Sequence, residues 1–361
     1  MTIYLDANAT EPLRPEARAA MLEAATMPGN PSSVHAPGRA ARRVLEESRE
    51  TIACRFAVAP ADVVFTSGGT EANVLAITGL PGRRVLVGAT EHDAVRAAAP
   101  DAEPIPVDAG GLADLSALER SLAAGGPALV CLMLANNETG VVHPIAEAAA
   151  LCRAAGALLH VDAVQAARIG FDAAALGADS IAVSSHKLGG PAGAGALLLC
   201  SEPARALTPL IVGGGQERGR RGGTPALPAI AGFAAASRAD YDVGRMAALR
   251  DRAEAAAIAC GAVVAGGAAP RLANTTCLAL PCVASVTQVI ALDLAGIAVS
   301  AGAACSSGKV ARSHVLQAMG LGALAGQAVR VSLPWTVTEA EVEAFAAAYR
   351  AMADRLARQA A

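Results

Sequence analysis

The sequence predicts an α/β protein built on a mainly parallel sheet covered by helices, with a smaller α+β domain attached. Short apolar runs alternate with Ala-rich stretches of helical character, and this alternation is typical of a parallel sheet with helices on both faces. After about residue 245 the pattern changes and a second block of helices begins. At 361 residues the chain is also long for one domain. We expect a large domain over residues 15–245 and a small domain formed by residues 1–14 and 246–361.

The expected strands are apolar runs that end at polar or Gly-containing turns. They cover residues 62–68, 83–89, 128–135, 157–163, 180–186 and 195–200. The expected helices are Ala-rich or amphipathic, and they cover residues 14–26, 38–56, 70–79, 145–156, 245–259 and 336–359. Pro15 suits the first position of the first helix, and Thr338 with Glu341 predicts a capping box at the start of the last one.

Composition and charge exclude several classes of protein. A net charge of −3 argues against nucleic-acid binding, which needs an excess of basic residues. No apolar run reaches the roughly 18 residues of a membrane span. The N-terminus lacks the basic start and apolar run of a signal peptide, so we expect a cytoplasmic protein. The eight cysteines form no CxxC pair, which favours neither a disulfide framework nor a metal site.

Two residue types stand out by their scarcity or their setting. Lys187 and Lys309 are the only lysines among 29 basic residues. Where arginine supplies the surface charge, a lysine indicates that an amine is needed, because arginine cannot form a Schiff base; two chance surface residues are the alternative. Cys305 lies among Gly, Ala and Ser, whereas the other cysteines lie in or beside apolar stretches. Cys305 therefore needs an explanation other than core packing.

Polar residues follow the expected strands, at the edge where α/β sheets bind ligands. Gly69 and Thr70 begin an expected helix, whose free N–H groups could bind the phosphate of a ligand. An ordinary turn with a helix cap would have the same sequence and is the alternative. His92 follows the next strand, and a structural hydrogen-bonding role is the alternative to catalysis there. Asn136 and Asn137 follow the strand after it, either as an ordinary loop or as donors to an oxyanion. Asp162 ends an apolar strand, where an unpaired charge is costly, so it needs a cation, a ring nitrogen or a backbone cap.

Lys187 follows a further strand, with Ser184 and His186 before it and a Gly-rich turn after it. A phosphate-binding turn, a buried acid and a lysine at successive strand ends together fit pyridoxal phosphate. The helix start would take the phosphate, the lysine would form the Schiff base, and the acid would keep the ring nitrogen protonated.

The chain resembles the cysteine desulfurases of the class V aminotransferase branch of pyridoxal-phosphate enzymes. The motifs YLDANAT, GNPSSVHAPGR, SGGTEAN, EHDAV, NNETGVV, HVDAVQ, SSHKLGGPAGAGAL, ERGRRGGT, SAGAACSSG and VRVSL occur in the family's order. The resemblance runs from Tyr4 to about Leu333 and implies a fold-type-I transferase. It also implies a homodimer, in which Thr224 reaches the phosphate bound by the neighbouring subunit.

The resemblance assigns roles to individual residues. Lys187 would form the Schiff base, Asp162 would face the pyridine nitrogen, Gln165 would face the ring oxygen, and His92 would stack on the ring and help move protons. Those expected to hold the phosphate are Gly69, Thr70, Ser184 and His186. Asn137 and Arg330 would hold the substrate carboxylate.

Cys305 would be the nucleophile that takes sulfur from L-cysteine, leaving L-alanine and a persulfide on Cys305. Lys309, four residues later, is hypothesised to lower the pKa of that thiol. The sulfur would go to a scaffold or other acceptor protein for iron–sulfur clusters, thio-cofactors or tRNA. Selenocysteine lyase, a class V aminotransferase-like enzyme on another amino acid, and a non-catalytic partner protein are the alternatives.

The sequence departs from the family pattern in two places. Glu11 stands where members commonly have a second threonine, and Ala311 and Arg312 stand where many carry an acidic-Pro stretch. The departures in the Cys305 loop leave the identity of the sulfur acceptor open. The arginines of residues 218–221 could also be read as a nucleic-acid patch, against which the acidic balance argues.

Overall fold

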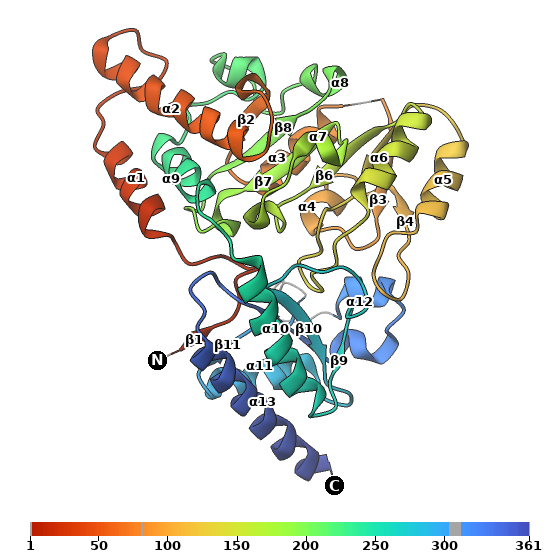
Figure 1. Cartoon of the computed structure of the whole chain (residues 1–361). Coiled ribbons are helices and arrows are strands. Elements are labelled where there is room, and N and C mark those ends of the chain that lie inside the picture. Colours follow the sequence, from red (N-terminus) through yellow and green to blue (C-terminus); the bar gives the residue numbers. More distant parts are fainter. Residues whose placement is uncertain (1, 81, 303–311, 361) are drawn as a thin grey trace.

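The computed structural model describes residues 2–80, 82–302 and 312–360, with side chains as far as residue 356. Cys305, Lys309 and Ala311 lie outside the described residues. A large sheet with its helices forms one part of the molecule, and a smaller group of strands and helices forms the other (Figure 1).

The large sheet confirms the predicted α/β fold class. Its strand order is β2-β8-β7-β6-β5-β3-β4. The strands are β2 (Val63–Thr66), β3 (Arg84–Gly88), β4 (Glu103–Ile105), β5 (Ala128–Cys131), β6 (Leu158–Asp162), β7 (Ser180–Ser184) and β8 (Gly195–Leu199). All pairings are parallel except those of β8, which runs antiparallel to β2 and β7. Each predicted strand is present, but β4 was missed, because three residues with Pro104 at their centre carry little strand signal.

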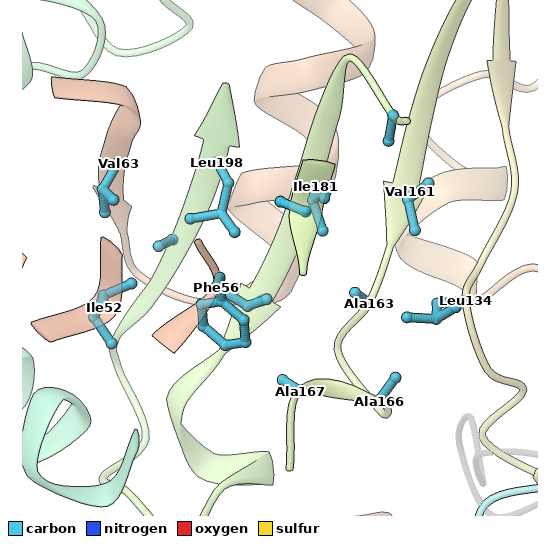
Figure 2. Close-up of a cluster of buried hydrophobic side chains, with 14 of the residues drawn as sticks. Ile52, Phe56, Val63, Leu134, Val161, Ala163, Ala166, Ala167, Ile181 and Leu198 are labelled. Atoms are coloured by element: carbon cyan, nitrogen blue, oxygen red, sulfur yellow. The ribbon is translucent and has the colours of Figure 1, made fainter. Parts of the chain in front are cut away.

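Both faces of this sheet are buried, which explains why its strands read as continuous apolar runs. Along β5, Val130 points into one hydrophobic cluster while Leu129 and Cys131 point into the other. Figure 2 shows part of the first cluster, which includes Phe56 and Ile181 of β7.

Helices cover the two faces unequally. The helices α1 (Pro15–Ala25), α2 (Ala36–Arg55), α5 (Leu115–Ala123), α6 (Ile145–Ala154) and α9 (Leu227–Ser237) pack on the first face. The other face is covered by α3 (Gly69–Thr78), α4 (Asp93–Arg96) and α8 (Glu202–Arg205). As predicted, α1 begins at Pro15.

The smaller group has its own strands and core. It contains β1 (Ile3–Tyr4), β9 (Val263–Val264), β10 (Thr275–Ala279), β11 (Ile297–Ala298), β12 (Ala328–Ser332), α10 (Val243–Ile258), α11 (Ser285–Leu294), α12 (His314–Ala318) and α13 (Glu339–Ala360). The N-terminal β1 pairs in parallel with β11 (Figure 1). At the start of α13 the backbone N–H of Thr338 donates to Glu341 Oε2 at 2.8 Å, and that of Glu341 donates to Thr338 Oγ1 at 3.3 Å, which confirms the capping box.

The domain boundaries at residues 15 and 245 stay predictions. Among the helices that the structure describes, none is both long enough and apolar enough to cross a membrane.

Candidate active site

A cavity of about 580 Å³ lies at the carboxyl edge of the large sheet. Ten of the residues singled out from the sequence line it: Gly69, Thr70, His92, Asn137, Asp162, Gln165, Ser184, His186, Lys187 and Arg330. They come from strand ends and helix starts of the large sheet and from β12 of the smaller group. Residues far apart in sequence therefore meet in one place.

Two singled-out residues are not in this group. Thr224 is exposed and lines a separate small pocket beside Ser67 and Gly223. Cys305 is outside the described residues, but Gly302 and Arg312 on either side of that segment line the cavity.

Lys187 lies in a short helical turn directly after β7. Its Nζ donates to the carbonyl oxygen of Asn8 and, at 2.9 Å, to that of Ala9. Burial, followed by the positive charges of Arg330 and Arg168, lowers the pKa of Lys187 from 10.5 to about 7. A substantial fraction of this amine is therefore neutral, and so nucleophilic, near pH 7.

Asp162 ends β6 with its side chain buried. Burial is the largest influence on its carboxyl group and raises the pKa. The carboxylate accepts hydrogen bonds from the backbone N–H of Val164 at 2.9 Å and from Asn73 Nδ2 at 2.8 Å. Of the partners that the sequence left open for Asp162, the structure supplies the backbone cap. Asn73, which sequence reasoning missed, supplies a second donor.

The helix α3 points its N-terminus at the cavity through Gly69 and Thr70. The first N–H groups of a helix have no intrahelical partner and favour an anion. A Cβ on Gly69 would lie 2.6 Å from Val164 Cγ2, so only glycine lets this helix end approach the strand end. Ser184 and His186 line the cavity from the end of β7 and the turn that follows.

His92 has the structural hydrogen-bonding role that the sequence left open for it. Its Nδ1 accepts a hydrogen bond from the backbone N–H of Ala94 at 3.1 Å, which caps α4. Because Nδ1 is the acceptor, the proton of a neutral ring lies on Nε2. His92 also lines the cavity, so its capping bond holds the ring in place there.

Arg330 reaches the cavity from β12. It donates to Asp6 Oδ1 at 2.6 Å and to the carbonyl oxygen of Asn137 at 3.1 Å. Its buried Nε has no hydrogen-bond partner among the described residues. A buried donor without a partner is costly, and a bound carboxylate would satisfy a guanidinium in this position.

The residues fit pyridoxal phosphate. Lys187 supplies a nucleophilic amine, Asp162 a carboxylate, and the start of α3 a set of N–H groups for a phosphate. These are the donor types that hold this cofactor in proteins. Within the described ranges, no group of three or more His, Cys, Asp or Glu side chains is arranged to hold a metal ion.

Sequence reasoning missed several residues that hold the site together. Asn8 accepts from Lys187 through its backbone carbonyl, which no side-chain motif could reveal. Asn73 lies three residues after Thr70 in the same motif, and that spacing on a helix was an available signal. Arg168 lies three residues after Gln165 and carries no motif of its own.

Comparisons with known proteins agree with the fold. The family model described as Aminotransferase class-V matches residues 3–345. A protein named cysteine desulfurase from Cereibacter sphaeroides is 42% identical, over 94% of this chain and 93% of that protein. One named IscS-like cysteine desulfurase from Mycobacterium tuberculosis is 37% identical, with the same two coverages.

Solved structures show the same likeness. A NifS-like protein from Rickettsia africae matches with a TM-score of 0.89 and 33% identity, covering 98% of this chain and 100% of that one. A protein called SspA, solved in complex with cysteine, matches with a TM-score of 0.80 and 28% identity over 92% of this chain and 99% of that one.

Proposed function

This chain belongs to the aminotransferase class-V family, and from that premise we propose that it is a pyridoxal-phosphate-dependent cysteine desulfurase. The observation that carries the proposal is the meeting of Lys187, Asp162 and the start of α3 in one cavity with Arg330. The first three provide a place for the cofactor, and Arg330 provides a place for an amino-acid carboxylate. The relatives named cysteine desulfurase support cysteine as the substrate.

Residues of the cavity wall would hold the cofactor in this site. Lys187 would bind its aldehyde carbon, Asp162 would face its ring nitrogen and Gln165 its ring oxygen. Its phosphate would be surrounded by Gly69, Thr70, Ser184 and His186. When bound, pyridoxal phosphate supplies an electron sink for bonds broken at the substrate's carbon atoms.

Arg330 would orient the substrate through its carboxylate. The planar guanidinium can donate two parallel hydrogen bonds to a carboxylate. Arg330 Nη2 also donates to Asp6 Oδ1 at 2.6 Å, and this bond holds the guanidinium in place. The Nζ of Lys187 would take the proton from the substrate's α-carbon, since its pKa of about 7 suits a general base at neutral pH. His92, fixed by its bond to Ala94, would assist with protons from Nε2.

Cys305 would receive the sulfur. Its thiolate attacks the sulfur of L-cysteine, an S–S bond forms, and the substrate's C–S bond breaks. The β-carbon keeps the electron pair and gains a proton, so the products are L-alanine and a persulfide on Cys305. The small residues around Cys305 and the positions of Gly302 and Arg312 on the cavity wall support this role.

Three further parts of the proposal rest on the family resemblance. A homodimer would bring Thr224 of one subunit to the phosphate site of the other, and the exposure of Thr224 suits such a role. A scaffold or other acceptor protein would receive the sulfur for iron–sulfur cluster, thio-cofactor or tRNA synthesis. The cytoplasmic location stays a prediction.

The test is to incubate the purified protein with L-cysteine and a reductant and to measure alanine and sulfide. Equal amounts of both products are expected from the wild type. The Cys305→Ala variant should bind the cofactor and release neither product, whereas the exposed Cys54→Ala control should match the wild type. Full turnover by Cys305→Ala would contradict the proposal.

A further inference from the structure

An ion pair lies buried behind the cavity wall. Arg168 Nη1 lies 3.0 Å from Glu11 Oε1, and each side chain is only 2% exposed. The second carboxylate oxygen of Glu11 accepts from the backbone N–H of Trp335 at 3.2 Å. The backbone N–H of Glu11 donates to the carbonyl oxygen of His186 at 2.9 Å, which ties the pair to the turn that carries Lys187.

The ion pair contacts the cavity through Gln165. Arg168 Nη2 donates to Gln165 Oε1 at 3.1 Å. A guanidinium carries donors only, so the amide of Gln165 must turn its oxygen toward Arg168 and its NH2 group away. The direction of this amide is therefore set by its charged neighbour.

The NH2 group of Gln165 points toward Asn8, another residue of the cavity wall. One of its hydrogens goes to the carbonyl oxygen of Asn8, with Nε2 and that oxygen 3.0 Å apart. The same carbonyl accepts from Lys187 Nζ. Gln165 lines the cavity, and an amide NH2 has two hydrogens, so the second one remains for a ligand acceptor next to the Lys187 amine.

We propose that the Glu11–Arg168 pair is a positioning device that makes Gln165 a hydrogen-bond donor, and never an acceptor, toward the oxygen of the bound cofactor's ring. Glu11 acts by neutralising Arg168, and Arg168 acts by orienting the amide. The inference rests on the proposed function, because the ring oxygen belongs to pyridoxal phosphate. It assigns a use to Glu11, the residue that departs from the family's threonine.

A purely stabilising role explains the pair less well. Burying two charges costs a large desolvation free energy, and apolar residues of similar volume often replace such pairs without loss of stability. The Glu11–Arg168 pair also fixes the direction of the Gln165 amide on the cavity wall. Apolar residues in its place could not do this, because they have no hydrogen-bond donor.

The experiment is a double-mutant cycle on cofactor affinity. The paired variant Glu11→Gln/Arg168→Met removes both charges together, so that no charge is left unpaired. It is compared with Gln165→Ala and with the triple variant. Each full-length protein is stripped of cofactor, and the dissociation constant for pyridoxal phosphate is measured from the change in visible absorbance. The control Glu254→Gln/Arg271→Met removes another largely buried ion pair, at 2.5 Å, that does not line the cavity.

Loss of one oriented hydrogen bond should weaken cofactor binding by on the order of tenfold in the paired variant. Gln165→Ala should show a similar loss. The triple variant should bind no more weakly than Gln165→Ala. The paired change removes two opposite charges together, so their effects on the Lys187 amine oppose each other, and the orientation of the amide is the effect that remains. The control pair should leave the affinity unchanged.

Two results would overturn the inference. One is a paired variant that binds as tightly as the wild type. The other is a triple variant whose losses multiply, which would mean that the pair acts independently of Gln165. A wild-type protein that takes up no pyridoxal phosphate would instead overturn the proposed function, and this inference with it.

Discussion

Asn73 Nδ2 donates a hydrogen bond to Asp162 Oδ2 at 2.8 Å, from a helix to a strand end 89 residues away in sequence. The other end of the Asn73 amide accepts from His160 Nε2 at 2.9 Å. Burial lowers the pKa of His160 to about 4, so its ring is neutral near pH 7 and bonded to Ser180 Oγ by Nδ1 at 2.9 Å. These linked hydrogen bonds fix the orientation of the Asn73 amide, so that its NH2 group faces Asp162.

Replacing Asn73 should therefore weaken both the fold and the site. In Asn73→Ala the Asp162 carboxylate loses a donor inside the protein, and we expect the free energy of unfolding to fall by about 1–3 kcal/mol. Urea unfolding of the cofactor-free protein measures this loss. The exposed Asn30→Ala serves as the matched control, and an equal loss in both variants would contradict the role given to Asn73.

Lys187 should react with pyridoxal phosphate at a lower pH than an ordinary lysine. Burial and the charges of Arg330 and Arg168 bring its pKa to about 7, and only the neutral amine attacks an aldehyde. The rate of cofactor uptake should rise with pH and level off above about pH 7. Stopped-flow absorbance measures it, with Nα-acetyl-lysine as the reference amine. A rate that keeps rising through pH 9, as for the reference, would refute this.

The same lowered pKa predicts how stability depends on pH. Between pH 7 and 10.5 the unfolded chain holds a proton on Lys187 that the folded, cofactor-free chain has lost. Stability rises with pH where the unfolded state binds more protons, so this group makes the free energy of unfolding increase across that window. Lys187→Met should reduce the increase, as measured by urea unfolding at several pH values. An unchanged pH dependence would show that the amine is not buried as described.

Gly69 should tolerate no side chain unless Val164 is shortened. A Cβ at Gly69 would lie 2.6 Å from Val164 Cγ2, so Gly69→Ala must push the start of α3 away from the cavity. We expect weaker binding of pyridoxal phosphate in Gly69→Ala and recovery in Gly69→Ala/Val164→Ala, measured by absorbance titration. Gly244, near the start of α10, has only Asp242 Oδ1 at 3.7 Å from such a Cβ. Gly244→Ala should leave the affinity unchanged, and failure of the Val164 change to restore binding would exclude the steric explanation.

Arg330 should determine the affinity for the substrate carboxylate. Lysine keeps the charge but lacks the planar fork, so Arg330→Lys should raise KM for L-cysteine by about 10- to 100-fold. Its effect on kcat should be smaller. Steady-state kinetics separates the two constants. Arg252→Lys, a control at an exposed ion pair with Glu339, should change neither, and an unchanged KM in Arg330→Lys would remove Arg330 from substrate binding.

The sequence by itself determined the fold class and pointed to ten residues of the cavity wall. Strands that are buried on both faces must be apolar throughout, which is why β5 and β6 could be recognised from the sequence. In such a sheet the ligand-binding residues follow the carboxyl ends of the strands. Lys187 stood out because all but two of the 29 Lys and Arg residues are arginine. The ten cavity residues were therefore accessible from local pattern and family resemblance together.

Tertiary structure decided what holds those residues in place. The partners of Lys187, Asp162 and Gln165 are a backbone carbonyl of Asn8, the amide of Asn73 and the guanidinium of Arg168, and they come from other elements of the chain. The pairing of Glu11 with Arg168 joins positions 157 residues apart. Hydrogen-bond direction, burial and the resulting pKa values depend on such distant contacts, so no local pattern in the sequence could supply them.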